Sequence, residues 1–334
     1  MREVSMKRAL IVLGLLALGL ALAQKPKVVI GTGSTGGVFF YYGTALADIW
    51  NKAGVVEAQP VQTGGSYDNL LLLRDRTDPR AGTYYCALTT TDSAYVAFTG
   101  EEPRFKAKPA KDQRVLFYMY PSFIHLVTSE KSGIKVVQDL KGKRVSTGQP
   151  GSSTENLALL LLQAAGVKPE SFAKRERLPV AEAAKALSEG TLDAFFWVGG
   201  LPTGSIVELS QSLARKGDRI YLVPIDPKST TAQVALKRFP GLLDTTVVPK
   251  SVYNTRTDVP GLNTGNVLVC PESLPKEVAY GMMKATFENL QTLRSAVAAA
   301  RDTSVANTAK LFGRFIVPFH PGAEEYLKEV GAIR

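Results

Sequence analysis

The sequence contains few of the residues that enzymes most often use for catalysis. Its 334 residues include two cysteines, Cys86 and Cys270, and two histidines, His125 and His320, which lie far apart in the chain. Neither the G-x-S-x-G turn of serine hydrolases nor the G-x-x-x-x-G-K-[ST] loop that binds nucleotide phosphates occurs. So few thiols and imidazoles also argue against a metal centre. We therefore expect a protein that is not an enzyme and that holds no metal and no cofactor.

These four residues have simpler interpretations. Cys86 and Cys270 would pair in an oxidising compartment, but their spacing fits a disulfide or two separate buried thiols, and both interpretations stay open. His125 lies in the apolar run 115–128, which predicts a core histidine. His320 precedes Pro321, which predicts a turn or a helix start.

Long apolar runs are missing except at the N-terminus. Arg2, Lys7 and Arg8 form a basic start, residues 9–22 are apolar, and Ala21-Leu22-Ala23 matches the cleavage pattern of secretory signals. The run is shorter than the roughly 20 residues that a comfortable membrane span needs. We expect residues 1–23 to be a signal peptide and the remaining protein to be periplasmic or otherwise extracytoplasmic. An uncleaved N-terminal anchor is the alternative.

The charge is unbalanced but not concentrated. Forty Lys and Arg residues against 30 Asp and Glu residues give a formal net charge of +10. No block of five or six basic residues occurs, and the basic segments 141–144 and 174–175 are typical of solvated turns. The surplus therefore predicts mild attraction for anionic solutes and no nucleic-acid partner.

Short β-rich runs alternate with helical stretches, a pattern typical of an α/β fold with mainly parallel strands. At 334 residues the chain exceeds what one core usually carries, so two lobes are expected. The extended runs 115–128 and 247–270 would carry the chain out of the first lobe and back. We expect lobe 1 to comprise residues 24–127 and 255–334, lobe 2 to comprise residues 128–254, and residues 275–297 to form one long helix.

Four loops share one composition: each follows a predicted strand, is rich in glycine and hydroxyl residues, and opens a predicted helix. They comprise residues 31–37, 63–66, 90–93 and 148–154. The first N–H groups of a helix lack partners within the helix and carry a partial positive charge, so such ends bind carboxylates and phosphates well. In an open α/β sheet, ligands bind at the carboxyl ends of the strands, where these loops lie. The pattern predicts a site for a small anion.

Each loop can also be read as an ordinary helix cap. Ser152 and Glu155 fit a capping box, in which the Ser152 hydroxyl caps the helix and the Glu155 carboxylate reaches back. The first loop also matches the glycine spacing of the dinucleotide fingerprint, but Glu57 stands at the start of the next predicted strand, the wrong end to reach a ribose. The convergence of four such loops is what favours a binding site.

Aromatic and acidic residues near these loops complete the predicted site. Tyr41 lies in the first helix and Trp197 ends a buried strand beside Gly199 and Gly200, and both aromatic residues are predicted walls of a cleft. Asp92 starts a helix, where a carboxylate is electrostatically favoured. It serves either as a cap or as the partner of a ligand ammonium group.

At these loops the chain resembles the TAXI family of solute receptors, the substrate-binding subunits of TRAP-type transporters. The matching segments keep a consistent order over nearly the whole chain: residues 30–37, 62–66 with Asn69, 139–145, 151–152, 190–196 and 320–323. The resemblance implies a two-lobed, periplasmic-binding-protein-like fold of type II with a hinged cleft. It further implies glutamate, glutamine or a dicarboxylate as ligand, and delivery to a membrane permease of the TRAP type. A ligand-sensing domain that uses the same cleft is the alternative.

The predicted ligand contacts come from both lobes. A ligand that touches both would stabilise their closed arrangement through its higher affinity for it. The residues expected to bind the ligand are Ser34, Thr35, Gly36, Gly37, Tyr41, Thr63, Gly65, Ser66, Asn69, Thr91, Asp92, Ser93, Ser152, Ser153, Thr154, Trp197, Gly199 and Gly200.

Overall fold

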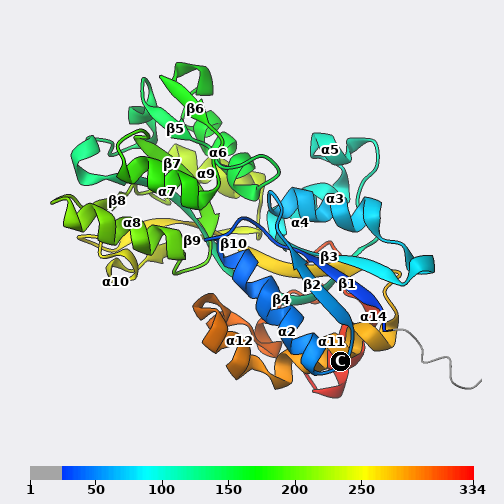
Figure 1. The fold of residues 1–334 in the computed structure, drawn as a ribbon. Coiled ribbons are helices and arrows are strands. Elements are labelled where there is room, and N and C mark those ends of the chain that lie inside the picture. The colour runs from blue at the N-terminus through cyan, green and yellow to red at the C-terminus, as the bar shows by residue number, and fades with distance from the viewer. Residues whose placement is uncertain (1–24) are drawn as a thin grey trace, which may run out of the picture.

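The computed structural model describes residues 25–334 (Figure 1). The predicted signal peptide, residues 1–23, lies outside this part of the chain. Within residues 25–334, no helix combines the length and the apolar composition needed to cross a membrane.

The first lobe contains three parallel strands in the order β2-β1-β3. A helix follows each strand, and α11 and α12 from the C-terminal part of the chain pack against α2 (Figure 1). Apolar side chains of these strands and helices form the core of this lobe. The elements are β1 (Lys27–Gly31), α2 (Val38–Lys52), β2 (Glu57–Val61), α3 (Ser66–Arg76), β3 (Thr83–Thr90), α4 (Thr91–Thr99), α5 (Pro103–Lys106), α11 (Lys276–Glu288), α12 (Leu290–Ala296), α13 (Val305–Ala309) and α14 (Pro321–Glu329).

The second lobe repeats the alternation of strands and helices on a smaller scale. Strands β6, β5 and β7 are parallel neighbours, and α7 and α8 pack against each other over an apolar cluster. The elements are β5 (Arg144–Ser146), α6 (Ser153–Ala164), β6 (Lys174–Glu176), α7 (Val180–Ser188), β7 (Ala194–Gly199), α8 (Gly204–Arg215), β8 (Ile220–Leu222), α9 (Thr230–Arg238), β9 (Leu243–Val248) and α10 (Lys250–Tyr253).

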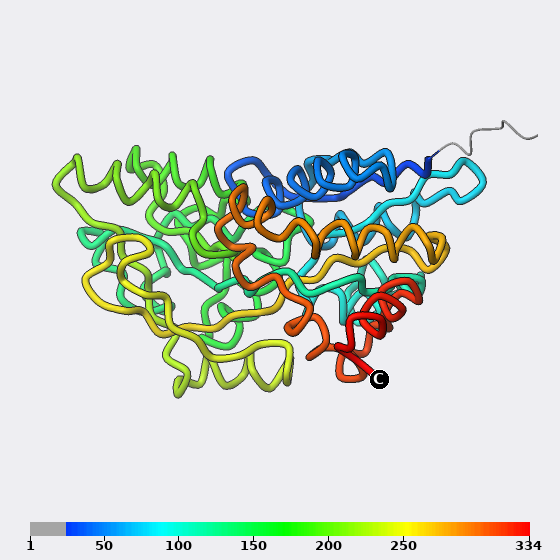
Figure 2. Tube along the Cα trace, turned by 90° about the horizontal axis from the view of Figure 1, so that it is seen from below, coloured from blue at the N-terminus to red at the C-terminus, as the bar shows by residue number. Residues whose placement is uncertain are grey.

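Two long antiparallel strands, β4 (Gln113–Ser129) and β10 (Val259–Pro271), run from one lobe into the other (Figure 2). In lobe 1, β10 pairs with β3; in lobe 2, β4 pairs with β7 and β8, and β10 pairs with β9. Hydrogen bonding therefore continues through both lobes in one sheet. The predicted two-lobed α/β fold class is confirmed.

The predicted lobe boundaries fall at these crossing strands. The boundary between residues 127 and 128 lies inside β4, and the boundary between residues 254 and 255 lies between α10 and β10. They stay a prediction about which residues move together as one lobe.

The prediction of one helix over residues 275–297 is wrong. Helices α11 and α12 are separate and meet at Asn289. The side-chain amide of Asn289 donates to the Ala285 carbonyl at 2.8 Å, while its backbone N–H goes to the Thr286 carbonyl at 3.2 Å. The side chain thus takes the acceptor that a continuing helix would have used, which is how asparagine often ends helices.

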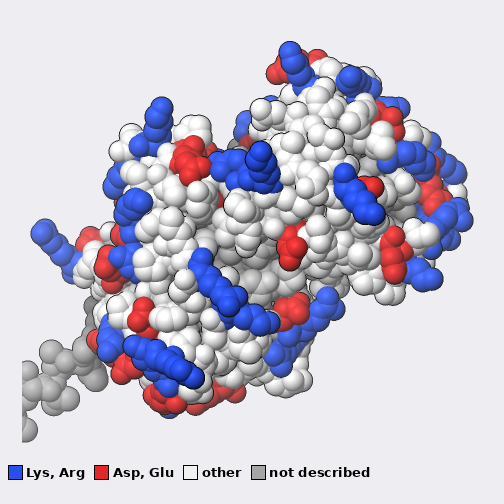
Figure 3. Space-filling view, turned by 180° about the vertical axis from the view of Figure 1, so that it is seen from behind, with Lys and Arg blue, Asp and Glu red and all other residues white. Residues whose placement is uncertain are grey.

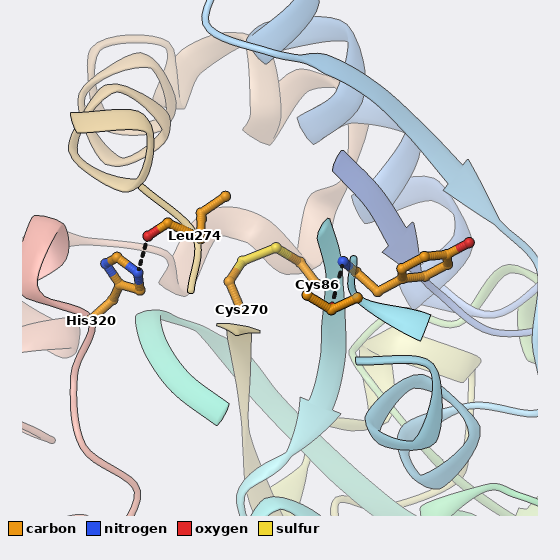
Figure 4. Close-up of a disulfide and its surroundings, with 6 residues drawn as sticks. Cys86, Cys270, Leu274 and His320 are labelled. Carbon is orange, nitrogen blue, oxygen red and sulfur yellow. Dashed lines mark hydrogen bonds between the residues drawn. A yellow bond between two sulfur atoms is a disulfide. The ribbon is translucent and has the colours of Figure 1, made fainter. Parts of the chain in front are cut away.

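Cys86 and Cys270 form a disulfide between the adjacent antiparallel strands β3 and β10 (Figure 4). The neighbouring residues Ala87 and Val269 are paired in register, and the two cysteine Cα atoms lie 4.2 Å apart. Both side chains are buried. Of the two interpretations that the spacing left open, the structure selects the disulfide, a bond typical of oxidising compartments.

His320 caps the start of α14, as the sequence predicted. Its Nδ1 accepts from the Gly322 N–H at 3.2 Å. Its Nε2 donates to the Leu274 carbonyl at 3.0 Å, the contact drawn in Figure 4. Burial lowers the pKa of His320 to about 4, so the folded protein holds this ring neutral at pH 7. His125 is also a buried core residue, as predicted, and burial lowers its pKa to about 4.

Folding should therefore become less favourable as the pH falls from about 6.5 toward 4. An unfolded histidine takes up a proton below about pH 6.5, whereas these rings stay neutral in the folded protein down to about pH 4. The unfolded state thus binds more protons in this pH range, so the free energy of unfolding decreases as the pH decreases. The variant His320→Asn keeps a side-chain acceptor that can cap the helix. In urea unfolding, its free energy of unfolding should decrease by about 2 kcal/mol less than that of the wild type between about pH 7 and about pH 4.5.

The comparison of the two proteins isolates His320. Asp92 and Asp112, whose pKa values burial raises, act in the opposite direction but are present in both proteins, as are the nearby Arg114 and Glu272. Identical pH dependence in the variant would contradict a buried neutral His320.

Candidate functional site

A cavity lies between the lobes, where the loops after β1, β2 and β5 meet the end of β7. It encloses about 420 Å³ outside the protein atoms, part of it open to solvent, and the centre of a water molecule fits into about 40 Å³ of it. The smaller volume is the part of the cavity that an atom centre can occupy with the lobes in contact. It is large enough for a compact group of a few atoms. The lining residues are Gly33, Ser34, Gly37, Val38, Phe39, Gly64, Gly65, Ser66, Tyr120, Ser122, Gln149, Ser152, Ser153, Thr154, Trp197, Val198 and Gly199.

The start of α2 supplies backbone donors to this cavity. Its first residue is preceded by Gly37, which has no side chain to cap the helix. Among the described residues, none accepts a hydrogen bond from the N–H of Val38 or Phe39. The neighbouring Ser34 hydroxyl is buried and has no partner in the described part of the chain. An anion in the cavity would satisfy these donors.

The start of α6 faces the same cavity from lobe 2. The Ser152 hydroxyl accepts from the Glu155 N–H at 3.2 Å, so the predicted cap is present. The other half of the predicted capping box is wrong, because the Glu155 carboxylate pairs with Arg175 at 2.9 Å and Arg177 at 2.5 Å instead. Within residues 25–334, no acceptor lies at the N–H of Ser153 or Thr154. These two donors complement those of α2 across the gap.

The start of α3 is capped by the other lobe. The Gly151 carbonyl accepts from the backbone N–H groups of Tyr67 at 3.0 Å and Asp68 at 3.3 Å. The Gln149 side-chain amide donates to the Gly64 carbonyl at 2.6 Å. This helix start was predicted to hold the ligand. Gly65 and Ser66 do line the cavity, but a lobe 2 carbonyl takes the next two N–H donors, and this contact joins the lobes beside the cavity.

The start of α4 lies outside the cavity and is hydrogen-bonded within the protein. The Thr264 hydroxyl, from β10, donates to Asp92 Oδ1 at 2.8 Å and lies 3.1 Å from the Thr91 hydroxyl. The Thr90 hydroxyl donates to the Ser93 hydroxyl at 2.8 Å. Asp92 does not line this cavity, so of the two roles left open for it, that of partner to an ammonium group of a ligand bound here is not supported.

The aromatic walls come from Phe39, Tyr120 and Trp197. Trp197 lines the cavity as predicted and lies close to Gly37, where an added Cβ would be 3.0 Å from its ring. Tyr41 does not line the cavity: it is 50% exposed on the outer side of α2. The Tyr120 hydroxyl, from β4, is buried without a partner among the described residues, and burial raises its pKa. Tyr120 is thus a neutral donor beside the cavity.

The structure brings together half of the predicted contact residues. Those that line the cavity are Ser34, Gly37, Gly65, Ser66, Ser152, Ser153, Thr154, Trp197 and Gly199. Those that do not line it are Thr35, Gly36, Tyr41, Thr63, Asn69, Thr91, Asp92, Ser93 and Gly200. Several of the second group have structural partners instead: the Asn69 amide, for example, donates to the carbonyls of Thr32 at 2.6 Å and Leu88 at 2.8 Å.

Other lining residues were not predicted. Phe39, Tyr120, Ser122 and Gln149 are the ones with side chains that bear on ligand binding. Gln149 had a usable signal, because it lies inside a predicted loop. Tyr120 and Ser122 lie in the long strand β4, where no local feature distinguishes them from core residues.

The site offers donors without charged side chains. Every lining residue between 25 and 334 is neutral, and the positive potential comes from the two helix starts. Within the same residues, no group of three or more His, Cys, Asp or Glu side chains is placed to hold a metal ion. The arrangement can bind a small anion through backbone amides and hydroxyls, with aromatic rings against its carbon atoms.

Comparisons with known proteins agree with this architecture. MatC from Rhodopseudomonas palustris, solved with bound malate, is 16% identical and superposes with a TM-score of 0.54 over 84% of this chain and 89% of that chain. A protein described as a periplasmic transporter is 16% identical, with a TM-score of 0.51 over 93% and 94% of the two chains. A Bordetella bronchiseptica RB50 protein is also 16% identical, with a TM-score of 0.50 over 92% and 81%.

At these identities the three structures show a shared fold. The sequence match is more specific: the model of the NMT1-like family covers residues 30–331, nearly all of the described chain. The chain therefore belongs to the NMT1-like family.

Proposed function

We propose that this protein is an extracytoplasmic solute receptor that holds a small organic anion between its lobes and presents it to a membrane permease. One observation carries the proposal: amides at the starts of α2 and α6, which have no acceptor within residues 25–334, come from different lobes and line one cavity together with the Ser34 hydroxyl. Because both lobes contribute donors, a bound anion would favour the arrangement in which they touch.

The ligand class follows from the lining. Neutral donors and aromatic walls suit a carboxylate with a short carbon chain, and the proposed ligands are glutamate, glutamine or a dicarboxylate. The malate bound to MatC, which shares the fold, supports the dicarboxylate within this group. The proposed contact residues are the cavity-lining members of the predicted set, with Phe39, Tyr120 and Gln149 added.

The transporter type rests on the motifs at the loops. Their resemblance to the TAXI receptors supports a TRAP-type permease as the proposed partner and the TAXI group as the proposed group of this receptor. The disulfide between Cys86 and Cys270 supports the extracytoplasmic location. The surface in Figure 3 fits this role, because Lys and Arg are spread over both lobes with Asp and Glu among them, unlike the continuous basic surface of a nucleic-acid-binding protein.

The test is to identify what the purified protein carries and what it binds. Mass spectrometry of small molecules released on denaturation should find an organic acid, and calorimetric titration should show binding of malate, glutamate or glutamine at one site per chain. Absence of binding to all three, with no acid released, would contradict the proposal.

Loss of the Ser34 or the Tyr120 hydroxyl, neither of which has a partner in the described part of the chain, should weaken binding moderately. Ser34→Ala and Tyr120→Phe each remove one donor and leave the backbone amides in place. A hydrogen bond to a charged group contributes about 1.5 kcal/mol or more, so each variant should bind the identified acid roughly tenfold more weakly. Thr35→Ala, in the same loop but exposed and outside the cavity, is the matched control and should bind like the wild type. Equal affinity in all three variants would remove both hydroxyls from the site.

A further inference from the structure

A second groove crosses the seam between the lobes and shares no residue with the anion cavity. Helices α3, α4 and α5 of lobe 1 form one wall, and α6 and α9 of lobe 2 form the other (Figure 1). The centre of a water molecule fits into about 370 Å³ of this groove, against about 40 Å³ of the anion cavity, so the groove is the roomier of the two. The ion pair between Glu101 and Arg238, at 2.8 Å, and the edge-to-face contact of Tyr95 with Phe239 join the two walls.

Asp92 lies in this groove and is the carboxylate that the anion cavity left unexplained. It is 1% exposed, and one of its oxygens, Oδ1, accepts from the Thr264 hydroxyl at 2.8 Å. The other oxygen, Oδ2, has no hydrogen-bond partner in the described part of the chain. Burial without a partner is unfavourable for a carboxylate, and a positive group would relieve it.

The other charges of the groove are already paired. Glu101 contacts Arg238, and Glu102 accepts from the Arg104 side chain at 2.7 Å and from its backbone N–H at 2.8 Å. Asp92 is therefore the carboxylate of the groove that no cationic side chain contacts within residues 25–334. The groove therefore has one buried carboxyl group without a cationic partner among the described residues, and a positive group placed beside it would favour its charged form.

The rest of the lining indicates what kind of positive group fits. Leu157 and Leu160 of α6, with Val96 and Phe239, give the groove apolar walls, and Tyr67 lines it together with Asp92. Apolar and aromatic walls suit the carbon atoms of an organic cation, and an aromatic ring attracts an ammonium group. One carboxylate is too few for a bound metal ion, and within residues 25–334 no cluster of metal-binding side chains occurs.

We propose that this groove is a binding site for a small organic amine, with its ammonium group on Asp92 and its carbon chain against Leu157, Leu160 and Phe239. The site is separate from the anion cavity and does not depend on the function proposed for it. Because the groove has one wall from each lobe, the amine would contact both lobes.

Calorimetric titration of the full-length mature protein with n-butylammonium and benzylammonium chloride tests the site, with potassium chloride as the inorganic control. Both amines should bind, and potassium should not. Asp92→Asn should weaken amine binding at least tenfold, since a hydrogen bond to a charged group is lost. Gln163→Ala, an exposed position on the rim, should leave it unchanged.

A second variant keeps the test decisive if Asp92→Asn does not fold. Leu160→Lys would place a tethered ammonium group in the groove, and its long side chain tolerates this partly buried position. It should abolish amine binding while leaving the circular dichroism spectrum and the binding of the organic acid unchanged. The proposal is overturned if neither amine binds, if potassium binds as well as the amines, or if folded Asp92→Asn or Leu160→Lys binds amines like the wild type.

Discussion

Gly64→Ala is expected to weaken binding of the organic acid about 10- to 100-fold, although residue 64 carries no side chain that could touch a ligand. An added Cβ at this position would overlap the carbonyl oxygen of Pro150, which belongs to the other lobe. The Asp68 carboxylate is also close but can rotate away, whereas the backbone of the opposite lobe cannot. Such overpacking typically costs about 1–3 kcal/mol, and here it falls on the contact between the lobes.

The effect should be specific to the lobe contact. Gly64 does not have a positive φ angle, so alanine fits its own loop without backbone strain. With the lobes held apart, the Gly151 carbonyl would no longer reach the N–H groups of Tyr67 and Asp68, and these amides should exchange hydrogen faster. Small-angle scattering should show a larger radius of gyration in the variant.

Gly204→Ala is the matched control. Gly204 also lacks a positive φ angle, and nothing lies within 4 Å of the position of its added Cβ. The control should bind and scatter like the wild type. If Gly64→Ala behaved like Gly204→Ala in all three measurements, the lobe contact seen at Gly64 and Pro150 would not determine affinity.

Removal of the disulfide is expected to cause the largest loss of stability. The bond closes a loop with a sequence separation of 184 residues, and it joins β3 of lobe 1 to β10, the strand that returns from lobe 2. Loss of a native disulfide typically costs about 2–5 kcal/mol, because the unfolded chain gains freedom. For a protein of this size, Cys86→Ala with Cys270→Ala should lower the unfolding temperature by roughly 5–15 °C.

Reduction provides the control for this prediction. When the disulfide of the wild type is reduced with dithiothreitol, its unfolding temperature should drop as much as that of the double variant. The unfolding temperature of the double variant should not change with the reductant. A wild type whose stability does not change on reduction would mean that the thiols are not paired. The binding site should be little affected in the folded double variant, because neither cysteine lines the cavity.

Strand positions and loop chemistry could be predicted because they depend on local sequence. The apolar run 115–128 stands out in the sequence, and it corresponds to β4, one of the two strands that connect the lobes. The Ser152 cap and the His320 cap likewise follow from residue type and position. The prediction of a continuous helix over residues 275–297 failed because the Asn289 side chain makes a competing hydrogen bond to the Ala285 carbonyl, which the helical pattern around it gave no reason to expect.

The site was harder to predict because its contacts join distant parts of the chain. Asp92 starts a helix after a hydroxyl-rich loop, as a ligand-binding residue would. Its hydroxyl partner, Thr264, is 172 positions away in the sequence. Phe39 and Tyr41 are two residues apart on α2, about 200° around the helix, so only one of them can face the cavity. The sequence does not show which of them, since that depends on how the helix packs against lobe 2.

The start of α3 illustrates the same difficulty. Like α2, it follows a glycine-rich loop and has no side chain that caps its first amides, so nothing in the local sequence distinguishes the two helix starts. The difference is the Gly151 carbonyl, which lobe 2 places on Tyr67 and Asp68. A helix start can therefore hold either a ligand or the opposite lobe, and the choice is made by tertiary structure.

The central claim is that one small anion is held by amides from both lobes, and backbone NMR tests it most directly. Titration of the ¹⁵N-labelled protein with malate, glutamate and glutamine should shift the amide resonances of Val38, Phe39, Ser153 and Thr154 together, at the same ligand concentration. A ligand that binds but shifts the amides of only one helix, or of neither, would contradict the account.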